Sequence, residues 1–172
     1  ESEGVVNTPA GVSYGDGVVM LGTKKGWQSS DQGETWMEGG AFEIYHTATG
    51  ESVFNTRQSI YVPTDGGRFF ITAQSGEKWG VSMSTDGGQT WSQPDMPGEC
   101  GQSVSTILGS STHIVMLHNK GLSCVSTDGG QTFTAHQVNM DADTFGSMQG
   151  TPVHDGTHFR AWGSRTAYTS ED

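Results

Sequence analysis

Basic residues are scarce in this chain. Only 8 of the 172 residues are Lys or Arg against 19 Asp or Glu, which gives a formal net charge of −11. Non-specific binding to nucleic acid depends on Lys and Arg that neutralise phosphates, so this balance argues against that function. An acidic surface of this kind mainly favours solubility.

Long apolar runs are absent as well. No stretch of about 18 apolar residues occurs, so we expect no membrane span, and no signal-peptide pattern precedes Glu1. The chain begins with ESEGVV and not with Met. This start is compatible with a mature N-terminus after removal of a leader, with a trimmed chain, and with further residues upstream.

Cysteine is limited to Cys100 and Cys124. In a protein that looks exported, such a pair predicts one disulfide, but two buried thiols fit the spacing equally well, because spacing does not establish the geometry of a bridge. No CxxC or Cys/His spacing typical of a zinc site is present. With 26 Gly and abundant Ser and Thr, the composition instead indicates a turn-rich β protein of one domain.

One eight-residue motif recurs. STDGGQTW at 84–91 and STDGGQTF at 126–133 are nearly identical, SSDQGETW at 29–36 is a looser copy, and Ser170-Glu171-Asp172 begins a fourth. The segments before each copy also align as strand, turn, strand and short strand, and a fourth strand begins at the Thr-aromatic pair. The recurrence predicts four-stranded antiparallel meanders, which are the blades of a propeller, at about 10–38, 57–93, 102–137 and 150–172 within a single domain, 1–172.

The motif S-x-D-x-G-x-T-W closely resembles the Asp box, or BNR repeat, of sialidase-type β-propellers, and the resemblance covers nearly the whole chain. Ser and Asp oxygens can bond nearby backbone NH groups, Gly can adopt positive φ, Thr can bond across the turn, and the aromatic ring can anchor the hairpin in the sheet core. We therefore assign a structural role to the following residues: Ser29, Asp31, Gly33, Thr35, Trp36, Ser84, Asp86, Gly88, Thr90, Trp91, Ser126, Asp128, Gly130, Thr132, Phe133, Ser170 and Asp172.

Rings of the family that the motif resembles typically have six to eight blades, so this chain is expected to supply about half of a larger ring. An incomplete ring leaves sheet faces and edges uncovered. Three arrangements would complete it: a second polypeptide, for instance the other half of a cleaved precursor; the remainder of a longer chain; or a symmetric dimer of half-rings.

Most of the cations fall on one predicted side of the propeller, opposite the repeated motif. Five lie in turns between the second and third strands of the blades, and Arg57 begins an inner strand. They are candidates for an anion site that would take a carboxylate, a sulfate or an acidic sugar, although exposed turns also favour Lys. The turn residues are Lys24, Lys25, Lys78, Lys120 and Arg165.

The long loop at 38–55 is the second candidate site. Its Glu43, Tyr45 and His46 offer an acid, a phenol and an imidazole for acid/base catalysis or for stacking on a sugar, while contact with a ligand or partner and plain surface packing are the alternatives. Resemblance to sialidases implies an arginine triad, a Tyr/Glu nucleophile pair, an acid/base Asp and an (F/Y)RIP-like motif. This chain departs from that pattern, because Ser59-Ile60-Tyr61-Val62-Pro63 lacks the arginine.

Two motifs point weakly to metals. DADTFG, with Asp141 and Asp143, opens like a calcium loop, but the twelfth position is Pro152 and not Glu. His154 and His158 flank a turn that holds Asp155, and a solvated hairpin explains them better than a metal pair. We expect no cofactor otherwise.

The sequence therefore predicts an all-β protein, exported to the periplasm, the cell surface or the medium, that binds a carbohydrate or a protein. Two alternatives stay open. One is a glycoside hydrolase, sialidase-like or glucanase-like, whose active site is shared with further blades, and the other is a structural or adhesion component of a surface. Because the Asp box also occurs in xyloglucan-type glucanases, sortilin-like receptors and photosystem assembly factors, the motif does not choose among them.

Overall fold

A computed structural model describes residues 11–15, 18–22, 26–40, 55–63, 66–75, 78–101, 104–118, 121–137, 153–155, 157–162 and 167–171. Within these residues every regular element is a β-strand, so the prediction of an all-β protein is confirmed. None of the described segments forms a helix long and apolar enough to cross a bilayer.

The strands form four antiparallel sheets in chain order. The first contains β1 (Gly11–Gly15), β2 (Val18–Gly22), β3 (Gly26–Ser29) and β4 (Met37–Glu38). The second contains β5 (Asn55–Val62), β6 (Arg68–Ser75) and β7 (Lys78–Ser84). The third contains β8 (Val104–Gly109), β9 (Ile114–His118), β10 (Leu122–Ser126) and β11 (Thr134–Gln137). The fourth contains β12 (Val153–His154), β13 (His158–Trp162) and β14 (Ala167–Glu171).

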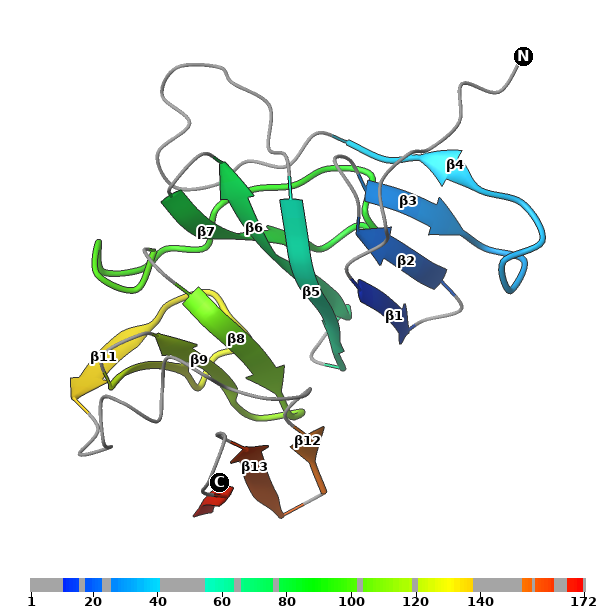
Figure 1. Ribbon diagram of the computed structural model, residues 1–172. Helices are drawn as coiled ribbons and strands as arrows, with labels where there is room; N and C mark the ends of the chain where they lie inside the picture. The colour runs from blue at the N-terminus through cyan, green and yellow to red at the C-terminus, as the bar shows by residue number, and fades with distance from the viewer. Residues whose placement is uncertain are drawn as a thin grey trace.

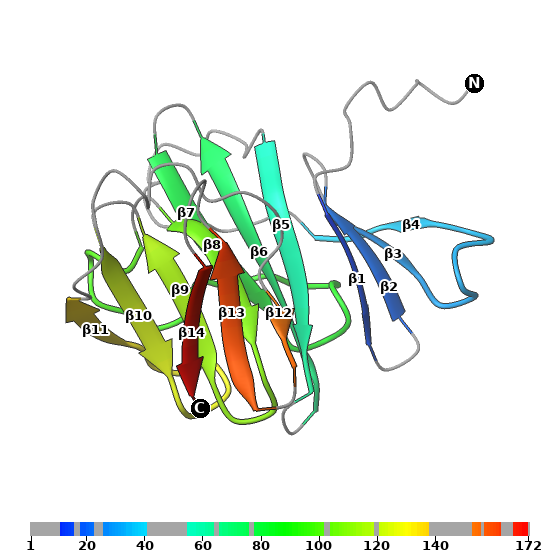
Figure 2. The same cartoon turned by 60° about the horizontal axis from the view of Figure 1, so that its bottom comes forward.

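The four sheets surround a common centre. Each begins at that centre with its first strand, so β1, β5, β8 and β12 are innermost and the later strands lie progressively outward (Figures 1 and 2). The innermost strands of neighbouring sheets are in contact, β1 with β5, β5 with β8 and β8 with β12. This radial order is the one that the repeat predicted.

The fourth strand differs from the prediction. It starts after the Thr-aromatic pair and not at it, at Met37 in the first sheet and at Thr134 in the third. In the second sheet it is reduced to an isolated bridge between Met83 and Ser92. The tight turn of each repeat occupies the residues up to the aromatic, so pairing with the neighbouring strand resumes only beyond it.

The main core lies between the second and third sheets. Its fully buried members include Val62, Phe70, Ile107 and Ile114, and Phe133 belongs to the same cluster. A smaller cluster joins the third sheet to the fourth through Leu108, Leu117 and Phe159. Sheet-on-sheet contact through apolar faces therefore stabilises the radial arrangement.

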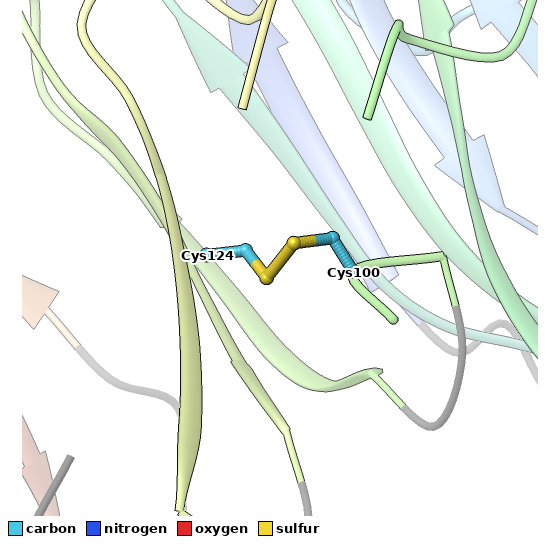
Figure 3. The surroundings of a disulfide bond; sticks show 2 residues. All are labelled: Cys100 and Cys124. Carbon is cyan, nitrogen blue, oxygen red and sulfur yellow. A yellow bond between two sulfur atoms is a disulfide. The ribbon is translucent and has the colours of Figure 1, made fainter. Parts of the chain in front are cut away.

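A disulfide links Cys100 and Cys124, which decides between the two alternatives that the spacing left open. The two Cα atoms lie 5.8 Å apart and both side chains are fully buried. Figure 3 shows that the bond joins the segment before β8 to strand β10. It therefore attaches the connection between two sheets to the middle of the third sheet.

Candidate functional site

The three copies of the repeat form the same turn, here called the repeated turns (29–36, 84–91 and 126–133). In the first, Ser29 Oγ accepts a hydrogen bond from Gly33 N at 2.7 Å and donates one to Asp31 Oδ1 at 2.7 Å. Asp31 accepts from the backbone N and the Oγ1 of Thr35. The other two turns repeat these bonds through Ser84, Asp86, Gly88 and Thr90, and through Ser126, Asp128, Gly130 and Thr132.

These bonds hold the aspartates in the charged form. The bonds from Thr35 and Ser29 lower the pKa of Asp31 to about 2. Burial raises the pKa of Asp128, but the bonds from Thr132, Ser126 and Gln131 outweigh it and lower that pKa to about 2. Because their carboxylate oxygens are used within the turns, the geometry fits a structural role for these groups.

The aromatic anchors of the turns are not equivalent. Trp91 and Phe133 are each only 6% exposed, as expected for residues in a sheet core, whereas Trp36 is 37% exposed. Phe133 belongs to the main core cluster, as does Phe70 of the second sheet. The indoles of Trp36 and Trp91 both donate a hydrogen bond to a glycine carbonyl of their own turn at 3.1 Å. Trp36 is thus held by its turn without being buried, contrary to the prediction.

A cavity of about 280 Å³ lies where the innermost strands meet, and we call it the axial cavity. All four innermost strands contribute to its wall, so segments from most of the chain's length converge there. The lining residues are Ser13 and Tyr14 from β1, Gln58, Ile60 and Tyr61 from β5, Ile107, Leu108 and Gly109 from β8, and His154 from β12.

Gln58 fixes the spacing of two strands that border the cavity. Its Nε2 donates to Ile107 O at 2.9 Å, while its Oε1 accepts from Ile107 N at 3.0 Å and from Thr106 Oγ1 at 2.8 Å. The side-chain amide therefore supplies the pair of bonds that a neighbouring strand would give. Both strands carry a register shift here, at Thr56/Gln58 in β5 and at Val104/Thr106 in β8, and such bulges redirect the side chains that follow.

The rings at the cavity are held by neighbours as well. Tyr61 packs against Phe69 with ring centroids 5.1 Å apart, and its ring lies so close to the backbone of Gly15 that a Cβ there would clash with it. His154 lies against Phe159 with centroids 4.7 Å apart. Tyr14 is 62% exposed. The cavity thus offers the supported rings of Tyr61 and His154, the exposed ring of Tyr14 and the second N–H of the Gln58 amide.

Most of the residues predicted to form a site lie outside the described part of the chain. These are Lys24, Lys25, Glu43, Tyr45, His46, Lys120, Asp141, Asp143, Arg165 and Asp172. Arg57 and Lys78 are described only as backbone, Arg57 at the register shift in β5 and Lys78 as the first residue of β7. Whether the cations form one anion site therefore stays a prediction.

The hairpin between β12 and β13 forms a polar cluster. Arg160 Nη2 lies 2.8 Å from Asp155 Oδ2, and His158 Nδ1 lies 3.6 Å from Asp155 Oδ1. Backbone bonds from His158 and Thr157, together with the Arg160 charge, lower the pKa of Asp155. His154 and His158 therefore have different partners, and the described residues contain no group of three or more side chains suited to a metal ion.

Sequence reasoning did not identify Tyr14, Gln58 or Tyr61 as site residues. The available signal was their position on the first strand of each repeat, because the first strands line the axis in a radial arrangement. Only contacts between strands far apart in the sequence show which of their side chains reach the cavity.

Comparison with known proteins agrees with this geometry. No protein-family model matches the sequence, and no curated protein does. Solved structures do match. Over 92% of this chain the fold superposes on the GH74 enzyme of Niastella koreensis with a TM-score of 0.60, at 18% identity and over 22% of that chain. YCF48 from Cyanidioschyzon merolae matches over 96% of this chain and 56% of its own, with a TM-score of 0.58 and 18% identity.

The fold is a β-propeller. The NanB sialidase of Streptococcus pneumoniae also matches, over 88% of this chain and 25% of its own, with a TM-score of 0.50 and 16% identity. At such identities the similarity shows the fold alone. This propeller chain spans about a fifth of the GH74 enzyme and about half of YCF48.

Proposed function

We propose that this chain is part of a propeller that binds a carbohydrate or a protein segment in the axial cavity. The composition of the cavity wall is the observation that carries the proposal. Tyr14, Tyr61 and His154 present rings and Gln58 an amide, beside the apolar Ile60. Ligand sites commonly combine apolar and aromatic walls with a few fixed polar groups. Aromatic rings also supply a large contact area at low entropic cost.

Proteins of the same fold are consistent with both ligand classes. A solved structure of YCF48 holds a D1 peptide. The GH74 enzyme and the NanB sialidase are enzymes, so the fold also carries catalysis. The sequence of this chain departs from the sialidase pattern, and the axial cavity offers groups for contact, so binding is the better supported role.

In the same proposal, the repeated turns are Asp boxes with a structural function, and Ser170 begins a fourth copy. The blades of the propeller lie near the predicted bounds 10–38, 57–93, 102–137 and 150–172. Further blades, from a second polypeptide or from more of the same chain, complete the ring. The Cys100–Cys124 disulfide supports a secreted, periplasmic or cell-surface protein, because such bonds persist in oxidising compartments.

Arrays of glycans and of peptides, probed with the full chain, test the proposal. Tyr14→Ala should lower the affinity for a captured ligand about tenfold, as expected for an aromatic contact. The matched control is Val12→Ala. Val12 is 62% exposed like Tyr14 and lies on the same strand, but it does not line the cavity, so its variant should bind normally.

If the Tyr14→Ala variant bound the ligand as tightly as the parent protein, the axial cavity would not be the binding site. A parallel incubation with chromogenic glycosides covers the alternative function. Turnover of any glycoside would replace the binding role with that of a hydrolase, and binding without turnover would support the proposal.

A further inference from the structure

A second cavity lies on the side of the molecule that carries the repeated turns, between the second and third sheets. Its volume is about 380 Å³, and it shares no described lining residue with the axial cavity. The second sheet contributes Pro63 and Arg68. The third sheet contributes Ser111, Thr112, Thr127, Asp128, Gly129 and Gln131. We call it the turn cavity.

Arg68 is positioned at this cavity by the neighbouring sheet. Its Nη1 donates a hydrogen bond to Gly129 O, 61 residues away in sequence. Its Nε is buried and has no hydrogen-bond partner among the described residues. Arginine has five N–H groups in a rigid plane, and one bond to Gly129 orients that plane without using the others. The guanidinium is therefore a fixed donor at the cavity wall.

Asp128 places a charge of the opposite sign in the same wall. Its carboxylate is bonded within its own turn by Thr132, Ser126 and Gln131, so it stays ionised. The wall therefore carries one positive group, Arg68, and one negative group, Asp128. A carboxylate ligand would be attracted by Arg68 but repelled by Asp128, and a cationic ligand would be attracted by Asp128 but repelled by Arg68. The wall therefore suits an uncharged ligand.

The rest of the wall is rich in groups that both donate and accept hydrogen bonds. Ser111, Thr112, Thr127 and Gln131 are all exposed. Hydroxyl and amide groups of this kind match the hydroxyl groups of a polyol, which also donate and accept. We infer that the turn cavity is a binding site for a neutral sugar unit, separate from the axial cavity.

The second sheet provides an internal comparison. A cavity of about 310 Å³ lies beside its repeated turn, at Thr85, Asp86 and Gly87. There the described wall is completed by two glycines and by the rings of Tyr61 and Phe69, with no arginine. Two copies of the repeated turn therefore border cavities of different chemistry. Of these two, only the turn cavity has an arginine beside the aspartate of the turn and an amide side chain, that of Gln131.

Amide chemical-shift mapping on the full chain tests the inference. Methyl β-glucopyranoside, glucuronate and glucosamine serve as probes because they share one ring and differ in charge. The glucoside should shift the amides of Thr127, Gly129 and Gln131, and should bind about fivefold or more tightly than the two charged sugars. The amides of Thr85 and Gly87 in the second turn should stay unchanged.

Variants at equivalent places separate binding from folding. Gln131 and Gln89 occupy the same position in the third and second turns, and both are exposed. Gln131 Nε2 also donates to Asp128 O at 3.2 Å, so the unfolding midpoints of the two variants are compared as well. Gln131→Ala should weaken glucoside binding about three- to tenfold through loss of a hydrogen-bonding group, whereas Gln89→Ala should leave it unchanged. Arg68→Gln should weaken binding further, and its unfolding midpoint shows whether the sheet contact survives.

Each result bears on the inference. Tighter binding of glucuronate than of glucoside would overturn it in favour of an anion site at Arg68. Shifts confined to the axial cavity, shifts at both turns alike, or no shifts at millimolar probe would each overturn it as well. Tyr14→Ala reports on the axial cavity alone. A negative result at the turn cavity therefore leaves the proposed function unaffected, and a negative result at the axial cavity leaves the turn cavity unaffected.

Discussion

The backbone of Gly109, at the end of β8, lies directly against the side chain of Val62, the last residue of β5. A Cβ at Gly109 would come within 2.5 Å of Val62 Cγ2 and within 3.3 Å of Ile60 Cδ1. Val62 is fully buried in the main core, so moving it would displace other core side chains. The close approach of these two inner strands therefore requires glycine at this position.

Gly109→Ala should lower the free energy of unfolding by about 1–3 kcal/mol, because the added methyl group overpacks the contact between two sheets. Urea denaturation measures the change. Val62→Ala creates space at the same point, so the double variant should lose less stability than the sum of the single variants. Strict additivity of the two changes would show that the residues do not interact.

Gln32→Gly should stabilise the protein by about 0.5–1 kcal/mol. Gln32 has a φ of 61°, and it is the only described residue other than glycine with positive φ. Gly87 and Gly129 occupy the same place in the other turns with a φ of 70° each. Side chains with a Cβ are strained in this region, although glycine also makes the unfolded chain more flexible. The reciprocal variant Gly87→Gln should destabilise by a similar amount, and thermal unfolding compares the two.

Acid should destabilise the fold between about pH 4 and pH 2. The pKa values of Asp31 and Asp128 lie at about 2, below the ordinary value of 3.8. A carboxylate with a lowered pKa in the folded state stabilises that state above its unfolded pKa and loses the effect as pH falls through the folded pKa. Urea midpoints at pH 6, 4, 3 and 2 follow the decline.

Asp128→Asn separates this effect from general acid unfolding. The variant should be less stable than the parent at pH 6 and should show a shallower decline toward pH 2, because it has no carboxylate to protonate in this turn. Identical declines in the parent and the variant would contradict a role for the turn carboxylate.

Reduction of Cys100–Cys124 should cost about 3 kcal/mol of stability, since the bond joins residues 24 positions apart and so constrains the unfolded chain. Urea denaturation with and without a reductant measures the loss. A Cys100→Ala/Cys124→Ala variant should start from lower stability and should not respond to the reductant. An unchanged midpoint of the parent protein in reductant would count against a stabilising bond.

The repeat explains why much of the fold could be predicted. Three near-copies give the strand order and the bonds of each turn, because Ser, Asp and Thr act on residues only two to four positions away. Such local chemistry is visible in sequence. The weaker parts of the prediction were the start of each fourth strand and the burial of Trp36, which depend on how neighbouring segments cover a turn.

The candidate site could not be predicted in the same way. Gln58 bonds Ile107 across 49 positions, and the bulges in β5 and β8 decide which side chains face the axis. Neither the bond nor the bulges can be predicted from the alternation of apolar and polar residues along a single strand. The disulfide is a similar case, since Cys100 and Cys124 come together only because the connection between the second and third sheets runs past β10.

Gln32 shows which part of the repeated turn dictates its shape. The backbone there turns to positive φ without glycine, while Ser29, Asp31 and Thr35 make the same bonds as in the other copies. The hydroxyl and carboxyl groups therefore impose the conformation of the turn. The first glycine of the motif only relieves the strain that positive φ causes in a residue with a Cβ. A search for this repeat in distant sequences should accordingly weight serine, aspartate and threonine, and accept residues such as Gln at the first glycine.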